Sequence, residues 1–131
     1  MILFSTSPSN QLFHLDGVKH ILPAYAHEIF ESNHALAIDV REYDEIVNLS
    51  IDCPQLLIYP LQSLNNIMEE IPKDTALVVI CDSGIRSAHA VDLLQKNGFI
   101  CVYNLDGGMN AWIDSQLPTA GRERDTCCKC N

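Results

Sequence analysis

The sequence has no long hydrophobic run. Its longest unbroken apolar stretch is the six residues from Ala76 to Cys81, whereas a membrane-spanning helix needs about 20. The N-terminus also lacks the basic start and the run of roughly 7–15 apolar residues that mark a secretory signal peptide. We therefore expect a protein that does not cross a membrane, carries no secretion signal and works in the cytoplasm.

Basic residues are scarce as well. The 131 residues include 8 Lys or Arg against 17 Asp or Glu, which gives a net charge of −9. An acidic surface repels the phosphates of nucleic acids and the headgroups of anionic membranes, so neither is an expected partner. With 47% apolar and 19% charged residues, the chain has the composition and length of one globular domain.

Cysteine is present in an even number, but a disulfide framework is not expected. The chain is long enough to bury a hydrophobic core and shows no secretion signal, so free thiols, metal ligands or a reactive thiol fit better. Cys101 stands in an apolar segment and is expected in the core, whereas Cys53 precedes a proline in a predicted loop. The six are Cys53, Cys81, Cys101, Cys127, Cys128 and Cys130.

Continuous apolar runs alternate with helical patterns along the chain. This order is typical of an α/β domain with a parallel sheet covered by helices on both faces. Ligands of such sheets bind beyond the carboxyl ends of the strands, where Asp39 and Cys81 stand. Strands are predicted at 35–40, 55–59, 75–80 and 99–103, helices at 23–32, 42–47, 61–71, 88–97 and 109–117, and a loop at 48–54.

The segment from Cys81 to Ser87 is the candidate active-site loop. A buried strand delivers Cys81 to a short loop, and a helix follows directly, so loop amides and the helix N-terminus can form a cradle that favours a thiolate. Gly84 permits backbone angles that other residues avoid. Arg86 is expected to brace the loop or contact an anion, and Ser87 suits a helix N-cap. In the alternative, Cys81 merely ends a buried strand.

Several ordered motifs resemble those of single-domain rhodaneses. Cys81-x-x-Gly84-x-Arg86-Ser87 resembles their active-site loop, and the run from Ile38 to Glu42 resembles their strand-end motif. The resemblance spans residues 21–118. Within this span, the segments 97–99 and 102–112 resemble the C-terminal half of these proteins. It implies a three-layer α/β fold with a mainly parallel sheet of about five strands. Residues 1–20 would then be an N-terminal extension and 119–131 a Cys-rich tail.

The resemblance also implies a sulfurtransferase. Cys81 would become a persulfide by attacking the sulfane sulfur of thiosulfate, a polysulfide or a persulfide, and would pass it to a thiol or protein cysteine, without metal or organic cofactor. Four residues separate Cys81 from Arg86, as in rhodaneses; the related phosphatases and arsenate reductases have five. The implied substrate-binding residues are Asp82, Ser83, Gly84, Ile85 and Arg86, and the supporting residues are Asp39, Arg41 and Ser87.

Three departures from the family pattern stand out. The loop at 48–54 differs from the usual glycine-containing stretch, so its geometry is not predicted. Asp82 replaces the basic residue of many thiosulfate-using enzymes and would repel a dianion by about 1 kcal/mol. The tail with Cys127, Cys128 and Cys130 is absent from the pattern. For this tail, metal binding, internal sulfur transfer and an end without function remain alternatives.

Two other functions stay open at this point. One is a non-catalytic rhodanese-fold module for binding or sensing, because a fold does not fix a function. The other is a thiol-based metal or metalloid handler that uses the tail. Asp39 and Arg41 are expected to be mainly structural, and His89 is expected at the surface. The remaining histidines, which show no ligand spacing, are His14, His20, His27 and His34. The physiological donor and the oligomeric state do not follow from the sequence.

Overall fold

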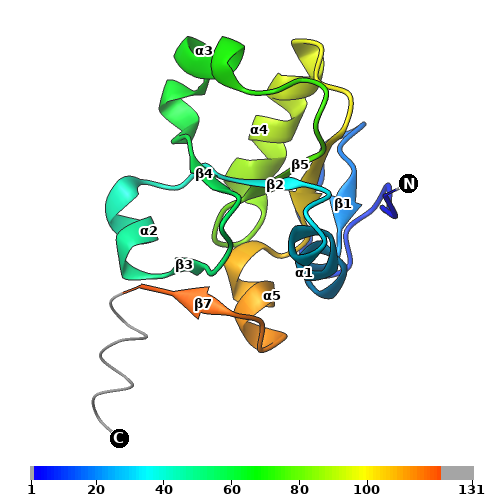
Figure 1. The fold of residues 1–131 in the computed structure, drawn as a ribbon. Coiled ribbons are helices and arrows are strands. Elements are labelled where there is room, and N and C mark those ends of the chain that lie inside the picture. Colours follow the sequence, from blue (N-terminus) through cyan, green and yellow to red (C-terminus); the bar gives the residue numbers. More distant parts are fainter. Residues whose placement is uncertain (1, 122–131) are drawn as a thin grey trace, which may run out of the picture.

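The computed structural model describes residues 2–121, so the predictions for the three tail cysteines lie outside the described part. Five strands form one parallel sheet in the order β1-β6-β5-β2-β4 (Figure 1). This arrangement confirms the predicted parallel α/β sheet of about five strands. The strands are β1 (His20–Ile21), β2 (Leu36–Asp39), β4 (Leu56–Ile58), β5 (Leu77–Ile80) and β6 (Val102–Leu105).

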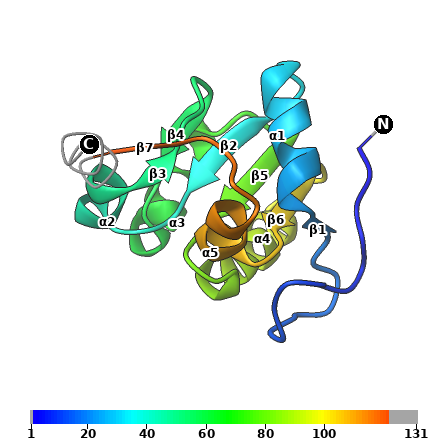
Figure 2. The same cartoon turned by 90° about the horizontal axis from the view of Figure 1, so that it is seen from below.

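Helices cover both faces of this sheet. On one face lie α1 (Pro23–Glu31) and α5 (Gly108–Asp114), which contact each other (Figure 2). On the other face lie α3 (Leu64–Ile67) and α4 (Ile85–Lys96), and α2 (Tyr43–Asn48) follows the carboxyl end of β2 (Figure 1). Within residues 2–121, no helix is both long and apolar enough to cross a membrane.

The central strand β5 is apolar at every position, and its burial on both faces of the sheet explains this pattern. Leu77 and Val79 pack into the core on the α3–α4 face, whereas Val78 and Ile80 pack into the core on the α1–α5 face. All four are at most 1% exposed. Successive side chains of a strand point to opposite faces, so a strand buried on both sides has to be apolar at every position.

Three predicted segments differ between the sequence analysis and the structure. The segment predicted as one helix at 61–71 forms η1 (Leu61–Ser63), the short α3 and η2 (Met68–Glu70). The backbone at Ile67, with φ −117° and ψ 6°, interrupts the α-helical geometry. Apolar residues three apart suit 3₁₀ turns as well as a helix, and Leu64 and Met68 are still buried.

The predicted strand at 99–103 begins later, and the core assignment of Cys101 is wrong. The Phe99 amide donates to the Leu94 carbonyl and closes the end of α4, so the strand starts only at Val102. Cys101 therefore lies before β6 and is exposed.

The segment predicted as a loop at 48–54 contains β3 (Ser50–Ile51), which pairs antiparallel with β7 (Thr119–Ala120). Such a short pairing between distant segments leaves no periodic signal in either segment.

Candidate active site

Cys81 directly follows β5 and is 1% exposed. The amides of Gly84 and Ser87 donate hydrogen bonds to its Sγ at 3.1 and 3.4 Å. Gly84 adopts φ +90°, a left-handed conformation that glycine accepts readily. Main-chain amides that converge on one atom stabilise negative charge there, so the loop is a cradle for an anionic sulfur.

The N-terminus of α5 fixes the start of this loop. Met109 and Asn110 donate their amides to the carbonyls of Cys81 and Asp82 at 2.8 and 2.9 Å. Gly108 lies so close to both carbonyls that a side chain there would overlap them. The glycine pair that precedes Met109 therefore lets two chain segments meet at the site.

Ser87 does not act as the N-cap that the sequence suggested. Helix α4 begins at Ile85 with Gly84 as its N-cap, because the helix has to start at once for its first amides to face the sulfur. Ser87 thus lies inside the helix and is fully buried. Its Oγ is 3.2 Å from Cys81 Sγ and donates to Asn104 Oδ1 at 2.5 Å.

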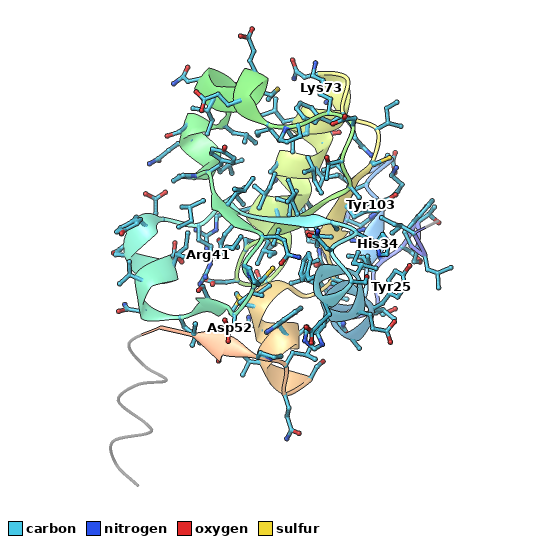
Figure 3. All side chains as sticks on the ribbon, viewed as in Figure 1. Tyr25, His34, Arg41, Asp52, Lys73 and Tyr103 are labelled. Carbon is cyan, nitrogen blue, oxygen red and sulfur yellow. The ribbon has the colours of Figure 1, made fainter. Side chains whose placement is uncertain are left out.

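Asp39 and Arg41 form a buried ion pair beside the loop, which suits the mainly structural role expected for both residues. Arg41 Nη2 lies 2.9 Å from Asp39 Oδ2, and Nη1 lies 3.2 Å from Asp82 Oδ1. Arg41 also donates to the Leu49 carbonyl at 2.7 Å, and Figure 3 shows it between α2 and the centre of the molecule. Burial lowers the pKa of Arg41, but the bonds to Asp39 and Asp82 outweigh it and raise the pKa.

Arg86 contacts carboxylates, not loop carbonyls. Its Nη1 lies 2.9 Å from Glu45 Oε1 and its Nη2 lies 3.2 Å from Asp82 Oδ2. The hydrogen bond from Arg86 lowers the pKa of Glu45 to about 2, and the same bond raises the pKa of Arg86. Asp82 is therefore held between two guanidinium groups, although its side chain remains 47% exposed.

The remaining loop residues face an open cavity. Ser83 and Ile85 line a space of about 530 Å³ together with the chain from Asn10 to Phe13. The Ile85 side chain is 45% exposed and Leu12 is fully exposed. The structure thus brings the predicted loop residues together around Cys81 and adds a wall from the N-terminal segment.

Sequence reasoning missed a polar network behind the cysteine. Asn104 Nδ2 lies 3.0 Å from His20 Nδ1 and 3.1 Å from Gln11 Oε1. His20 Nε2 lies 2.8 Å from His14 Nδ1. The run around Asn104 supported the family resemblance but gave no sign of a site role, and the segment with Gln11 has no periodicity.

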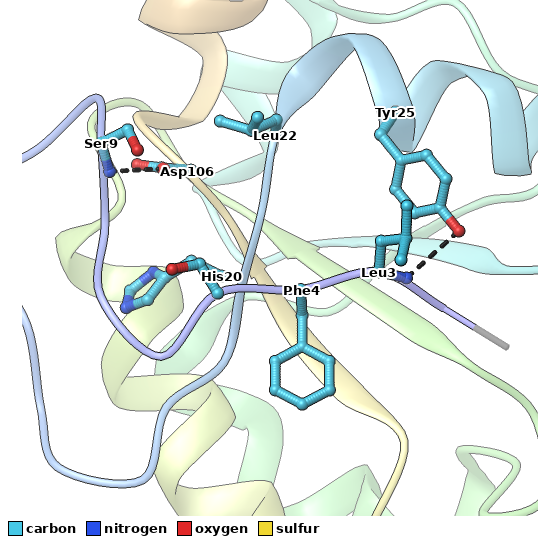
Figure 4. A pocket seen from close by; sticks show the side chains of 8 residues that line it. Leu3, Phe4, Ser9, His20, Leu22, Tyr25 and Asp106 are labelled. Atoms are coloured by element: carbon cyan, nitrogen blue, oxygen red, sulfur yellow. Dashed lines mark hydrogen bonds between the residues drawn. The ribbon is translucent and has the colours of Figure 1, made fainter.

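Asp106 ties the N-terminal segment to this network. Its carboxylate accepts the amide of Ser9 at 2.7 Å (Figure 4) and the amide of Asn10 at 2.9 Å. The adjoining apolar cavity of about 250 Å³ is lined by Leu3, Phe4 and Tyr25, among others. Both oxygens of Asp106 are thus committed to holding the segment in place.

His20 is 1% exposed, and its two ring nitrogens are both within hydrogen-bonding distance of a partner, so it is a satisfied buried histidine. Burial lowers its pKa, with a smaller opposing effect of Asp106.

Cys53 and His89 lie outside the cradle. Cys53 is half-buried, and burial raises its pKa, which makes it a poor nucleophile. His89 is exposed, as predicted, and its ring packs against Phe13 with 5.2 Å between centroids. In the chain from residue 2 to 121, no cluster of three or more His, Cys, Asp or Glu could hold a metal ion.

Comparisons with known proteins agree with this geometry. Residues 22–115 match the family described as rhodanese-like domain. A sulfurtransferase of Allochromatium vinosum is 37% identical over 93 residues, which cover 71% of this chain and 85% of that protein. The putative sulfurtransferase YtwF of Bacillus subtilis is 38% identical over 102 residues, 77% of this chain and 96% of that protein.

Solved structures show the same fold. The polysulfide-sulfur transferase homodimer of Wolinella succinogenes matches with a TM-score of 0.68 and 27% identity, over 79% of this chain and 78% of that chain. The chain therefore belongs to the rhodanese-like family, which confirms the resemblance seen in the sequence. Within that family it is a sulfurtransferase of the rhodanese type.

Proposed function

We propose that the protein carries sulfane sulfur as a persulfide on Cys81 and passes it to a thiol. The observation that carries this proposal is the pair of main-chain amides, from Gly84 and Ser87, that donate to Cys81 Sγ. They stabilise the sulfur as an anion before attack, and the same loop can stabilise the terminal sulfur afterwards. This is covalent catalysis, in which one nucleophile links two half-reactions.

In the first half-reaction, the Cys81 thiolate attacks the sulfane sulfur of the donor. A new S–S bond forms while the bond between that sulfur and the rest of the donor breaks, and the leaving group takes the bonding electron pair. With thiosulfate the leaving group is sulfite, and with a polysulfide it is the polysulfide shortened by one sulfur. Cys81 is then a persulfide whose terminal sulfur carries the negative charge.

In the second half-reaction, an acceptor thiolate attacks the terminal sulfur. The bond to Cys81 Sγ breaks, the acceptor becomes a persulfide and Cys81 returns as a thiolate. A small thiol or a cysteine of a partner protein can serve as this acceptor. The described cysteines Cys53, Cys81 and Cys101 are all free thiols, which suits a reducing compartment, and we place the reaction in the cytoplasm. Nucleic acids and membranes are not proposed partners.

The charges beside the cradle favour donors that carry little charge. Within residues 2–121, the carboxylates of Asp39, Asp82 and Glu45 around the loop are paired with the two guanidinium groups of Arg41 and Arg86. One negative charge therefore remains unbalanced where a thiosulfate dianion would approach. Persulfide donors with less charge at the reacting end meet less repulsion. The polysulfide-sulfur transferase among the structural relatives supports a sulfane-sulfur donor other than thiosulfate.

The test is the intact mass of the protein after incubation with thiosulfate or with polysulfide. The expected result is an increase by one sulfur atom, which cyanide removes and which peptide mapping assigns to Cys81. An unchanged mass with every donor would overturn the persulfide mechanism.

A further inference from the structure

A side chain from outside the region that matches the family is hydrogen-bonded to the cradle loop. Gln11 precedes residues 22–115 and contacts the cradle loop from the N-terminal segment. We infer that Gln11 is a positioning residue, which orients the peptide group between Gly84 and Ile85 so that the loop amides face Cys81. The inference rests on the proposed persulfide chemistry of Cys81.

Four hydrogen bonds fix the amide group of Gln11. Its Nε2 donates to the carbonyls of Gly84 and Phe13 at 3.0 and 2.8 Å. Its Oε1 accepts the Gly107 amide at 2.8 Å and Asn104 Nδ2 at 3.1 Å. Because the nitrogen faces two carbonyls and the oxygen faces two donors, only one orientation of this amide satisfies all four partners.

The bond to the Gly84 carbonyl sets the direction of the next amide. In a planar trans peptide the carbonyl and the following N–H point in opposite directions. With the Gly84 oxygen bound to Gln11, the Ile85 N–H points away from Gln11. This peptide lies in sequence between the amides of Gly84 and Ser87, which donate to Cys81 Sγ, so its rotation would displace the loop that aims both of them. Gln11 therefore holds the loop in the orientation that accepts negative charge.

The same side chain also helps to fix Ser87, whose main-chain amide donates to Cys81 Sγ. By accepting from Asn104 Nδ2, Gln11 leaves Asn104 Oδ1 free to accept the hydroxyl of Ser87. The Ser87 hydroxyl proton then points to Asn104, and the residue is held from its side chain while its amide faces the sulfur. The fit is close, because a side-chain carbon on Gly84 would overlap Gln11.

The test compares Gln11→Glu and Gln11→Met with a matched control, Gln95→Glu. Gln95 also donates its Nε2 to a main-chain carbonyl of the N-terminal segment, that of Gly17 at 3.1 Å. This bond does not involve the cradle loop. The measurement is the single-turnover rate at which Cys81 gains one sulfur from polysulfide, followed by intact mass. Melting temperature and circular dichroism are recorded for each variant.

Both Gln11 variants should load sulfur about ten-fold more slowly, a smaller loss than the removal of a direct donor to a reacting anion. Gln95→Glu should load at the rate of the unmodified protein. Gln11→Glu provides a further readout, because a protonated carboxyl can again donate to the Gly84 carbonyl. Its rate relative to the unmodified protein should rise as the pH falls from 8 to 5. The rate is compared with that of the unmodified protein at each pH, because both proteins carry His14, His20 and Asp106 near this network.

A purely structural role predicts a different result. It would lower the melting temperature of the Gln11 variants without slowing sulfur loading at temperatures where they are folded, and it would give no recovery of Gln11→Glu at low pH. Either result would overturn the inference. If the unmodified protein gains no sulfur at all, the proposed function fails instead, so the two failures are distinguishable. Should Gln11→Glu not fold, Gln11→Met alone decides, since it keeps the bulk and removes all four hydrogen bonds.

Discussion

At the residue scale, the proposed chemistry depends on one sulfur atom and on the groups that surround it. Cys81 is almost inaccessible to water, and its Sγ has three polar neighbours: two main-chain amides and the Ser87 hydroxyl. A thiol in such surroundings differs from the exposed Cys101 and the half-buried Cys53. The half-buried Cys53 and the exposed Cys101 are therefore reference thiols with which Cys81 can be compared.

Replacing Cys81 with Ser should abolish sulfur transfer and keep the fold. The hydroxyl can use the same hydrogen-bond partners, but it is not ionised at neutral pH and cannot form a persulfide. Turnover with polysulfide and melting temperature are the measurements. Cys53→Ala and Cys101→Ala serve as controls and should retain most activity. Near-normal turnover of Cys81→Ser would move the nucleophile elsewhere.

Replacing Asp82 with Asn should improve the use of thiosulfate. The structure shows why Asn is the better choice than a basic residue: a third guanidinium would stand beside those of Arg41 and Arg86. Removing one charge should lower the KM for thiosulfate several-fold at low salt and less at high salt, because exposed charges are screened. A donor with less charge should respond less. An unchanged KM at every salt concentration would show that Asp82 does not repel the donor.

At the scale of the elements, helices α2 and α4 are joined through the side chain of Arg86. The guanidinium of α4 bridges Glu45 of α2 and Asp82 of the loop. This contact holds the loop in addition to its main-chain anchors on α5. A planar fork of donors can bridge two carboxylates, whereas an ammonium group acts as a single point charge.

Arg86→Lys should therefore reduce activity more than stability. The lysine keeps the charge near Glu45 but cannot hold both carboxylates in the same geometry. We expect kcat/KM for sulfur transfer to fall about ten-fold, while the melting temperature changes little because the pair is partly exposed. The control is Lys96→Arg, which alters an exposed i,i+4 pair with Asp92 far from the loop. Unchanged kinetics of Arg86→Lys would leave Arg86 with only a surface role.

The elements also show what the sequence could predict and what it could not. Strand β5 and the loop after it could be predicted from the sequence. The apolar run and the turn-forming residues beside it are local signals, which depend only on residues close together in the chain. The start of α4 was misplaced by three residues, since Gly84 rather than Ser87 caps it. The pairing of β3 with β7 and the contacts of Gln11 were not predictable, because they join segments that are distant in sequence and carry no local pattern.

At the scale of the whole molecule, the sheet edge and the site share one buried network. His20 of β1 contacts Asn104 of β6, and Asn104 contacts both Ser87 and Gln11. Burial lowers the pKa of His20, so the folded protein holds this ring neutral at pH values where the unfolded chain binds a proton.

Acidification should destabilise the protein through His20. A base whose pKa is lower in the folded state contributes no penalty above the unfolded value of about 6.5. Below that pH the unfolded state binds the extra proton, and the free energy of unfolding falls by at most about 1.4 kcal/mol per pH unit. The melting temperature should therefore drop more between pH 7.5 and 5.5 than it does for His20→Gln. Equal slopes for both proteins would show that His20 does not titrate on unfolding.

The anchors of the cradle on α5 also determine when the site can exist. Ribosomes make the chain from its N-terminus, so Cys81 is synthesised before Gly108, Met109 and Asn110. Until these residues are added, the carbonyls of Cys81 and Asp82 have no partners from α5, and the loop amides have no fixed direction. The nascent cysteine is therefore an ordinary thiol. The cradle around its sulfur is therefore complete only after residue 110 has joined the fold.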